Sequence, residues 1–394
     1  MNKLERLINE LCPDGVEYKT LGEIGKFTRG NGLQKKDFVE VGKPVIHYGQ
    51  IYTKYNFSTD ITYSFTEEGI YKKLRKAKKN DILIATTSEN VKDVAKCVVW
   101  LGEEEIGFSG DMYSFSTQEN SKYVAYYFQT NYFQRKKELK VTGAKVMRIH
   151  SNDMEKFEIP LPPLPVQEEI VRILDTFTEL TTELTTELTT ELTMRKQQYE
   201  YYIKNLFTKA KNNEMITLNE ISENCDTQRK PVTSGNREKG NIPYYGASGI
   251  VDYVKDYIFD GDYLLISEDG ANLLARNTPI AFSISGKTWV NNHAHVLKFS
   301  EYATRRYVEI YLNSIDLKPY ITGAAQPKLN QKNLNSIKIP LPPLEEQQRI
   351  VDILDRFDTL VNDIKEGLPA EIVMRKQQYE YYRDKLLTFK KLEK

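Results

Sequence analysis

The longest uninterrupted pattern of polar and apolar positions lies near the middle of the chain and is typical of a helix. From Pro165 to Thr208 there is no glycine and no further proline, and leucine and glutamate, which favour helices, are frequent. Such a helix would be roughly 65 Å long at ~1.5 Å per residue. Because a globular domain does not need so long a helix, we expect this segment to be a spacer.

Within this predicted helix, four tandem copies of Thr-Glu-Leu-Thr occupy residues 178–193. On a helix of ~3.6 residues per turn, an apolar residue at every fourth position drifts by about 40° per copy. The stripe should therefore pack against a partner helix over a limited length, and the alternative is low-complexity filler. The stripe consists of Leu180, Leu184, Leu188 and Leu192.

Shorter patterns on both sides of this helix predict compact α+β domains. Apolar runs of strand length, such as residues 81–85 and 262–266, are bounded by turn residues. Helix-like stretches follow at 121–139 and 301–315, and residues 1–13 begin with a charged amphipathic helix that should pack with the long helices. The predicted fold class is α+β, with two globular domains separated by two long antiparallel helices in a coiled-coil spacer.

The chain contains an internal repeat. Residues 159–202 return as residues 339–382, and 25 of these 44 positions are identical. Each copy opens with Ile-Pro-Leu-Pro-Pro-Leu, and the second contains Gly367 and Pro369, where we expect a kink or break. The inserts before the two copies share little except Thr-Leu-x-Glu-Ile near their starts and Thr-Gly-Ala at 142–144 and 322–324. A duplicated frame with unlike inserts, related by a pseudo-two-fold repeat, suggests one molecule that reads two different things. The predicted parts are 1–13, 14–158, 159–213, 214–338 and 339–394.

Composition narrows the possible functions. The 55 Lys and Arg residues balance the 55 Asp and Glu residues, which excludes a globally basic nucleic-acid coat but permits local basic faces. Cys12, Cys97 and Cys225 share no close spacing, so neither a disulfide framework nor a zinc site is indicated. No apolar run approaches the roughly 18 residues of a membrane span, and the N-terminus does not resemble a signal peptide. We expect a reduced, cytoplasmic protein.

Tests for catalytic motifs give no credible set, so we expect no catalytic residue, no metal site and no cofactor on this chain. The two Pro-Pro pairs lack the polar and aromatic neighbours of a DNA amino-methyltransferase motif, and no Gly-x-Gly-x-x-Gly loop occurs. Residues 285–288 end like a phosphate-binding loop, but Ala281 replaces its first glycine. Asp14 and Glu17 lie too close in sequence to form a nuclease site. His293 and His295 lack a third ligand and should lie on a polar surface.

Basic, amide and aromatic residues cluster in both inserts, as contacts to phosphates and base edges require. Ordinary solvated surface is the alternative for each cluster. The run of lysines at 72–79 is a weaker candidate than the glycine-flanked loops, because it suits only phosphates or water. The candidates in the first insert are Arg29, Asn31, Gln34, Lys35, His47, Tyr48, Gln50, Lys145 and Arg148. Those in the second are Arg229, Lys230, Tyr244, Tyr245, Ser248, Asn291, Asn292, His293, Gln326 and Lys328.

Taken together, the two unlike inserts, the two Ile-Pro-Leu-Pro-Pro-Leu-then-helix segments and the tandem repeat at 178–193 resemble the DNA specificity subunit of type I restriction–modification enzymes. The likeness covers nearly the whole chain. The central repeat is similar to the Thr-Ala-Glu-Leu repeats of one subgroup, with Thr in place of Ala.

The resemblance implies a non-catalytic reader of double-stranded DNA whose two target recognition domains, 14–158 and 214–338, each recognise half of a split target. It also implies two modification subunits as partners, which bind S-adenosylmethionine and methylate adenine, and restriction subunits, which use ATP and Mg²⁺. A reader from a fused or stand-alone restriction system remains an alternative. A helical adaptor that binds proteins and never touches DNA is another.

Overall fold

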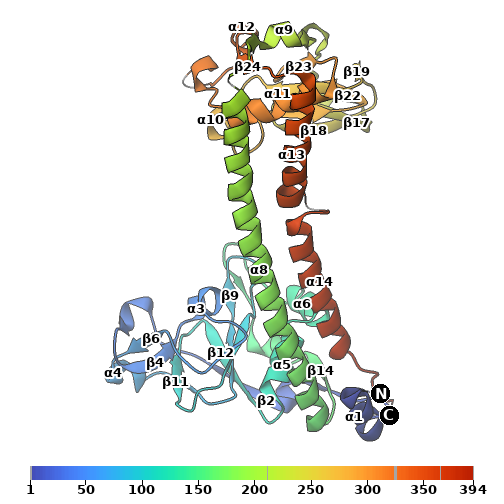
Figure 1. Ribbon diagram of the computed structural model, residues 1–394. Helices are drawn as coiled ribbons and strands as arrows, with labels where there is room; N and C mark the ends of the chain where they lie inside the picture. Colours follow the sequence, from blue (N-terminus) through green and yellow to red (C-terminus); the bar gives the residue numbers. More distant parts are fainter. Residues whose placement is uncertain (1, 211, 324–325, 364, 394) are drawn as a thin grey trace. The chain divides into compact units, whose positions relative to one another are not determined.

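The computed structural model describes residues 2–210, 212–323, 326–363 and 365–393, so Ala324 of the second Thr-Gly-Ala segment lies outside the described residues. The chain forms two compact units (Figure 1). Unit 1 comprises Met1–Thr186 and Val373–Lys394, and unit 2 comprises Glu187–Ile372. These units cut across the expected segments, because the first helix and the last helix belong to unit 1 and the central helix contributes to both.

Unit 1 is an α+β unit in which two five-stranded sheets have the orders β2-β12-β8-β10-β5 and β3-β6-β4-β11-β7. Two small two-stranded sheets, β1-β14 and β13-β9, accompany them. The strands are β1 (Glu17–Thr20), β2 (Gly25–Arg29), β3 (Phe38–Val39), β4 (Lys43–Ile46), β5 (Ser58–Thr59), β6 (Ser64–Thr66), β7 (Lys76–Ala77), β8 (Ile82–Ala85), β9 (Thr87–Ser88), β10 (Cys97–Trp100), β11 (Ile106–Phe108), β12 (Met112–Thr117), β13 (Met147–Arg148) and β14 (Glu158–Leu161). The helices are α1 (Lys3–Leu11), α2 (Leu21–Ile24), α3 (Tyr48–Thr53), α4 (Glu68–Tyr71), α5 (Ser121–Phe128), α6 (Asn131–Glu138), α7 (Ser151–Met154), the first part of α8 (Leu164–Ala210) and α14 (Leu368–Leu386), whose first turn lies in unit 2.

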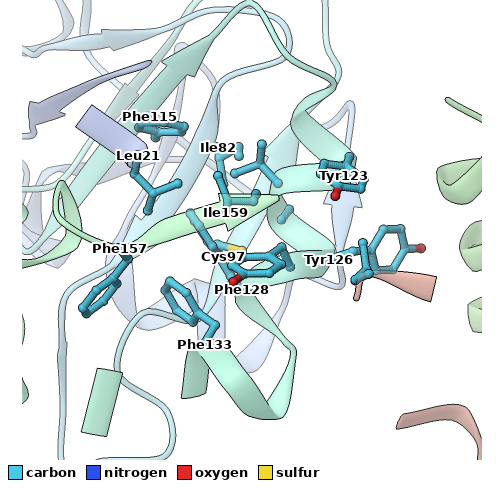
Figure 2. Close-up of a cluster of buried hydrophobic side chains, with 14 of the residues drawn as sticks. Leu21, Ile82, Cys97, Phe115, Tyr123, Tyr126, Phe128, Phe133, Phe157 and Ile159 are labelled. Carbon is cyan, nitrogen blue, oxygen red and sulfur yellow. The ribbon is translucent and has the colours of Figure 1, made fainter. Parts of the chain in front are cut away.

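The central strand β8 is buried on both faces, which explains its continuous apolar run. Alternate side chains point to opposite faces of a strand. Ile82 and Ile84 accordingly join the core that α5 covers, whereas Leu83 and Ala85 join the core between the two sheets. Figure 2 shows Tyr123, Tyr126 and Phe128 of α5 gathered beside Ile82 and Ile159 in the first of these cores.

Unit 2 repeats this plan with fewer strands. Its two four-stranded sheets have the orders β16-β23-β20-β21 and β18-β17-β22-β19, and a two-stranded sheet pairs β15 with β24. The strands are β15 (Met215–Thr217), β16 (Glu223–Asn224), β17 (Lys239–Gly246), β18 (Gly249–Val254), β19 (Phe259–Asp260), β20 (Tyr263–Ser267), β21 (Ala281–Ile284), β22 (Lys287–Val290), β23 (Ala294–Lys298) and β24 (Lys338–Pro340). The helices are α9 (Leu218–Ile221), α10 (Asn272–Ala275), α11 (Tyr302–Ser314), α12 (Gln331–Asn335), α13 (Leu344–Asn362) and the second part of α8. Short 3₁₀ turns occupy Lys35–Asp37 in unit 1 and Asp226–Gln228, Ser234–Asn236 and Lys318–Tyr320 in unit 2.

The duplicated segments form the same local structure twice. Ile159 and Ile339 lie on β14 and β24, which pair antiparallel with β1 and β15. After each Pro-Pro pair a buried glutamine caps the turn into the helix. Gln167 donates to the carbonyl oxygen of Pro162 at 2.8 Å, and Gln347 donates to that of Pro342 at 2.7 Å. The sequence repeat is therefore a repeat of structure.

The long helix and the break in its counterpart are confirmed. The helix α8 runs without interruption over Leu164–Ala210, whereas α13 ends at Asn362 and α14 begins at Leu368, on either side of Gly367. A Cβ on Gly367 would lie 2.4 Å from the carbonyl oxygen of Thr359, so a larger residue does not fit this junction.

Paired helices run antiparallel within each unit. In unit 1, Thr178 of α8 hydrogen-bonds to the hydroxyl of Tyr379 of α14 at 2.9 Å. In unit 2, Tyr199 and Tyr202 of α8 contact Phe357 of α13, and Phe207 shares a core with Ile350 further towards the start of α13. Burial along the leucine stripe of α8 varies as the expected drift requires, from 56% exposed at Leu180 to 8% at Leu188, with Leu184 and Leu192 between them.

Other expected elements differ in detail. The stretch 121–139 forms two helices, α5 and α6, because Thr130 ends the first and caps the second by accepting a hydrogen bond from the amide of Phe133. The stretch 301–315 forms the single helix α11. Helix α1 is capped by Asn2, and Lys3 pairs with Glu169 of α8 at 2.7 Å, so the N-terminal helix packs on the duplicated frame. Within the described residues, no helix is both long and apolar enough to cross a membrane.

Candidate nucleic-acid interface

In unit 1 the strand order brings several loops to one edge of the central sheet. Strand β12 pairs antiparallel with both β2 and β8. The ends of β2 and β8 and the start of β12 therefore share one edge, which we call the loop edge. It carries residues 30–37 after β2, residues 109–111 before β12, and strand β9 after β8, which pairs with β13. The Arg29 side chain donates to the carbonyl oxygen of Gly110 at 3.3 Å, which joins the first two of these loops.

Unit 2 has an equivalent loop edge. Strand β23 pairs antiparallel with β16 and β20. Residues 225–230 after β16, 291–293 before β23 and 268–270 after β20 therefore lie together. The backbone of Asp269 forms a bridge with that of Lys328, which brings residues 326–328 to the same edge. The two loop edges occupy the same place in two similar sheets, but their residues differ.

The sequence candidates cluster at these edges, and most of them are exposed. The amide side chain of Asn31 bonds to the backbone of Lys73 and Arg75, so that the loop after β2 lies against the start of the lysine run. Tyr48 follows β4, and its amide donates to the hydroxyl of Ser109. The amide of Asn291 likewise donates to the carbonyl oxygen of Tyr245. Exposed candidates are Arg29, Asn31, Gln34, Lys35, Lys145, Arg148, Lys230, Ser248, Asn292, His293, Gln326 and Lys328, and Tyr48 and Tyr245 are half-buried.

Four buried candidates must be corrected, because their polar groups hold loops together instead of facing outward. At the start of α3, His47 accepts from the amide of Gly49 and Gln50 accepts from that of His47. Burial, with the charge of Lys35 nearby, lowers the pKa of His47. In unit 2, Tyr244 is 1% exposed and its hydroxyl accepts from the amide of Val232, while the side chain of Asn291 accepts from the amide of His293.

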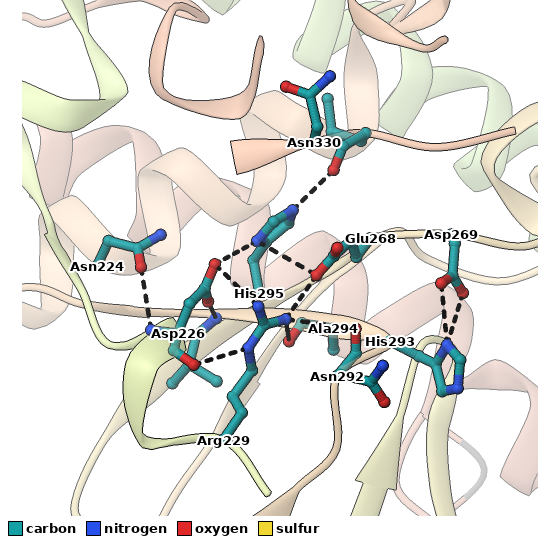
Figure 3. Close-up of polar contacts among 12 residues, drawn as sticks. Asn224, Asp226, Arg229, Glu268, Asp269, Asn292, His293, Ala294, His295 and Asn330 are labelled. Carbon is teal, nitrogen blue, oxygen red and sulfur yellow. Dashed lines mark hydrogen bonds and ion pairs between the residues drawn. The ribbon is translucent and has the colours of Figure 1, made fainter. Parts of the chain in front are cut away.

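Arg229 is half-buried, and its guanidinium is part of a polar network beneath the loop edge of unit 2 (Figure 3). It donates to Glu268 at 2.6 Å and to the carbonyl oxygen of Ala294 at 2.8 Å. Glu268 also pairs with Lys328 at 3.0 Å. Burial alone would raise the pKa of Glu268, but the hydrogen bonds from Arg229 and Lys328 hold it below its usual value. This network connects the loops at 225–230, 291–293 and 326–328.

His295 belongs to the same network, which corrects its expected place on the surface. It is 1% exposed and forms a 2.6 Å hydrogen bond with Asp226 and a 2.7 Å hydrogen bond with the carbonyl oxygen of Leu329. Burial acts to raise the pKa of Asp226, but the hydrogen bond and charge of His295 bring it below its usual value. His293, by contrast, is exposed and bonds to Asp269, as Figure 3 shows. In the part of the chain that the structure describes, no group of three or more His, Cys, Asp and Glu residues could hold a metal ion.

The lysine run at 72–79 is partly neutralised. Lys72 pairs with Glu68, Lys78 with Glu105 and Lys79 with Glu103. Lys76 donates instead to the carbonyl oxygens of Tyr71 and Leu74. Lys72, Lys78 and Lys79 therefore already have carboxylate partners within unit 1.

Sequence reasoning missed the carboxylates beneath the loop edges. Asp111 pairs with Arg148 at 3.4 Å, and Glu268 pairs with Lys328. The sequence does show that Arg148 and Lys328 are equivalent positions, because they are separated by the same offset as the two copies of the duplicated frame. This equivalence was the available signal that the two basic residues have similar surroundings.

Two α+β domains with unlike loop edges, each docked on one copy of a duplicated strand-and-helix frame, define a class of two-domain specificity proteins. Residues 13–194 and 210–374 match the family described as "Type I restriction modification DNA specificity domain". The chain belongs to this family, whose members are the non-catalytic specificity subunits of type I restriction–modification complexes.

Individual relatives agree with this assignment. The specificity subunit of the type I restriction enzymes EcoR124I and EcoR124II of Escherichia coli is 32% identical over 429 aligned positions, which cover 100% of this chain and 98% of that protein. A Haemophilus influenzae protein described as a specificity subunit is 40% identical over 181 residues, 45% of this chain and 46% of that protein. The crystal structure of the HsdS subunit from Thermoanaerobacter tengcongensis has the same fold, with a TM-score of 0.53 at 16% identity over 96% of this chain and 97% of that one.

Proposed function

We propose that each unit recognises one half of a bipartite, asymmetric DNA target through its loop edge. The observation that carries this proposal is the presence of two unlike loop edges at equivalent places in a duplicated frame. Unit 1 offers Arg29, Gln34 and Lys35 there, whereas unit 2 offers Asn292 and His293. Arginine and lysine suit the acceptors of guanine, and amide side chains suit adenine. Different side chains in one geometry fit two different half-sites.

The test exchanges residues 214–338 for the equivalent insert of another family member, in a host that expresses the modification subunit. We expect one half-site of the methylated sequence to change and the other to stay the same, as read by single-molecule methylome sequencing. A change in both half-sites would contradict independent reading. Failure of the parent complex to select any DNA sequence would instead favour the helical adaptor that never binds DNA.

We further propose that the duplicated helices dock two copies of one modification subunit. Met194 and Tyr201 are 58% and 64% exposed, and their counterparts in the second copy, Met374 and Tyr381, are 56% and 62% exposed. Identical exposed apolar residues at equal offsets make two similar surfaces. The partners would bind S-adenosylmethionine and methylate adenine, and restriction subunits with ATP and Mg²⁺ would join them. The three buried free cysteines suit a cytoplasmic complex.

Native mass spectrometry of the assembled complex tests this second proposal. We expect two modification subunits on the parent chain and one on either the Tyr201→Ala or the Tyr381→Ala variant. Tyr253→Ala, which removes an exposed tyrosine from β18, is the matched control and should retain both. A parent complex that saturates with one modification subunit would contradict the proposal.

A further inference from the structure

One hairpin is common to both loop edges although the loops around it differ. Thr142 and Arg148 exchange two backbone hydrogen bonds, of 2.9 and 2.7 Å, and Thr322 and Lys328 exchange two of 2.8 Å. Thr142, Gly143 and Arg148 in unit 1 correspond to Thr322, Gly323 and Lys328 in unit 2. We call this feature, which occurs once in each unit, the shared hairpin. Each of its positions in unit 2 follows its counterpart in unit 1 at the offset that separates the two copies of the duplicated frame.

The backbone of the shared hairpin requires glycine in both units. Gly143 has φ +122° and Gly323 has φ +83°, both in the region that side chains disfavour. A Cβ would lie 2.1 Å from the carbonyl oxygen of Val146 at the first and 2.5 Å from that of Gln326 at the second. The two hairpins therefore share a glycine at equivalent sequence positions where the backbone leaves no room for a side chain.

Each hairpin presents a cation in the same setting. Arg148 pairs in register with Thr87 just after β8, and Lys328 forms a bridge with Asp269 just after β20. Each cation therefore lies beside the segment that follows this strand at the loop edge. Their side chains are 46% and 51% exposed. The partner carboxylates, Asp111 and Glu268, lie at the same loop edges.

These carboxylates leave donors available. The ion pair with Asp111 engages one amino group of Arg148, which has five N–H donors, and the ammonium of Lys328 has three donors. Each carboxylate thus holds its cation at the edge, and each cationic side chain stays about half exposed to solvent. An anion that approaches the edge meets a pre-positioned cation in both units.

The shared hairpin contrasts with its unlike neighbours. If the two domains recognise different base sequences, a structural feature that both domains share should contact a feature of DNA that both half-sites share. In DNA this is the sugar–phosphate backbone, whose contacts fix register but carry no sequence information. Building on the proposed function, we propose that Arg148 and Lys328 bind backbone phosphates, one in each half-site. The unlike loops 30–37 and 291–293 are left to read bases.

The test measures binding of the complex with its modification subunits to a target duplex and to an unrelated duplex over a range of salt concentrations. Arg148→Gln and Lys328→Gln should each weaken binding to both duplexes by a similar factor, on the order of three- to tenfold. Each should lower the slope of log K against log salt by about 0.9, the value for one lost phosphate contact. The methylated sequence should not change. Lys255→Gln, which removes an exposed, ion-paired lysine from another part of unit 2, is the control and should leave the slope unchanged.

The conservative exchanges separate charge from folding. Arg148→Lys and Lys328→Arg each install the residue of the other unit, so the parental salt slope should return. An altered base preference in Arg148→Gln or Lys328→Gln would overturn the proposal in favour of a base contact. A parental slope combined with loss of a modification subunit would overturn it in favour of a protein contact.

The same measurements distinguish this proposal from the proposed function. If the parent complex fails to prefer its target duplex, the proposed function itself fails. If the parent complex prefers the target but the Gln variants keep the parental slope, only the shared-hairpin proposal fails.

Discussion

The hydroxyl of Tyr123 donates a 2.9 Å hydrogen bond to the carbonyl oxygen of Pro160. Tyr307 donates an equivalent 2.7 Å bond to Pro340 in unit 2. The two prolines are separated by the offset of the duplicated frame but the two tyrosines are further apart in sequence, so the two inserts reach the same contact through chains of different length. The contact joins α5 to β14 and α11 to β24, and thus fixes each recognition domain to its copy of the duplicated frame.

Replacing either tyrosine by phenylalanine should destabilise its own unit. Both hydroxyls are buried, and each variant leaves a buried carbonyl oxygen without its donor, at a cost of about 1 to 3 kcal/mol. Hydrogen exchange of the isolated chain should show faster exchange around β14 for Tyr123→Phe and around β24 for Tyr307→Phe. Tyr201→Phe, at an exposed position, should change stability by less than about 0.5 kcal/mol. Equal loss of protection in both units from one substitution would contradict this local role.

The elements that the sequence predicted are those whose signal is local. An uninterrupted pattern of good helix formers predicted α8, and Gly367 with Pro369 predicted the break between α13 and α14. The boundary between α5 and α6 was missed because Thr130, unlike glycine or proline, also occurs inside helices. Its capping hydrogen bond marks it only once the chain has folded.

Whether a polar candidate is buried in a network or exposed depends on contacts with residues far away in the sequence. A single sequence does not show these contacts. His295 bonds to Asp226, 69 residues away, and Arg229 bonds to Glu268, 39 residues away. In sequence, both looked like surface residues beside a turn. The neighbouring candidates Asn292 and His293 are exposed at the loop edge, as expected. Residue type alone did not separate a network residue from an exposed one.

Glu169 should make stability depend on acid pH. Its side chain is 2% exposed and accepts hydrogen bonds from Arg172 and Lys3, which lower its pKa to about 2. Because this value lies below that of an unfolded glutamate, ionised Glu169 stabilises the fold above pH about 4.5, and this contribution is lost as the pH falls through about 2. Glu169→Gln should therefore cost about 1 to 3 kcal/mol at pH 7.

Denaturation curves measured between pH 7 and pH 2 check this expectation. The difference in the free energy of unfolding between the parent and Glu169→Gln should shrink below pH about 4.5. Glu168→Gln, at the exposed neighbouring position, is the control and should change stability little. A difference between parent and Glu169→Gln that stays constant down to pH 2 would show that the ion pairs with Lys3 and Arg172 are not its source.

Arg229→Met should weaken recognition by unit 2 without changing the sequence that it reads. The substitution leaves Glu268 without its closest cation and the carbonyl oxygen of Ala294 without a donor, so the loop at 291–293 loses its support. We expect faster hydrogen exchange over residues 290–296 and lower methylation occupancy at the parental target. Lys298→Met, at the exposed far end of β23, should do neither. A new base preference in Arg229→Met would instead indicate direct base contact by the arginine.

The tandem repeat of α8 should set the gap between the two half-sites. Deleting Thr185-Thr186-Glu187-Leu188 removes four residues from α8, which shortens the helix by about 6 Å and rotates its later part by roughly 40°. The four-residue spacing of the leucines survives the deletion, so the helix keeps an apolar stripe. The contacts that fix each unit, Thr178 with Tyr379 and Tyr199 with Phe357, lie outside the deleted segment. Each recognition domain should therefore keep its fold and its half-site.

The residues that contact Thr178 and Tyr199 are Tyr379 and Phe357. The stretch from Phe357 to Tyr379 is almost equal in length to the stretch from Thr178 to Tyr199. The deletion shortens only the stretch from Thr178 to Tyr199. The residues between α13 and α14 must therefore absorb the difference in length between the two stretches. One base-pair step is ~3.4 Å. We therefore expect the gap between the two half-sites to shorten by a small whole number of base pairs. Replacing the same four residues by alanines, which keeps the helix length, is the matched control and should retain the parental gap. A deletion strain whose methylome shows the parental gap at full occupancy would mean that the repeat does not measure spacing.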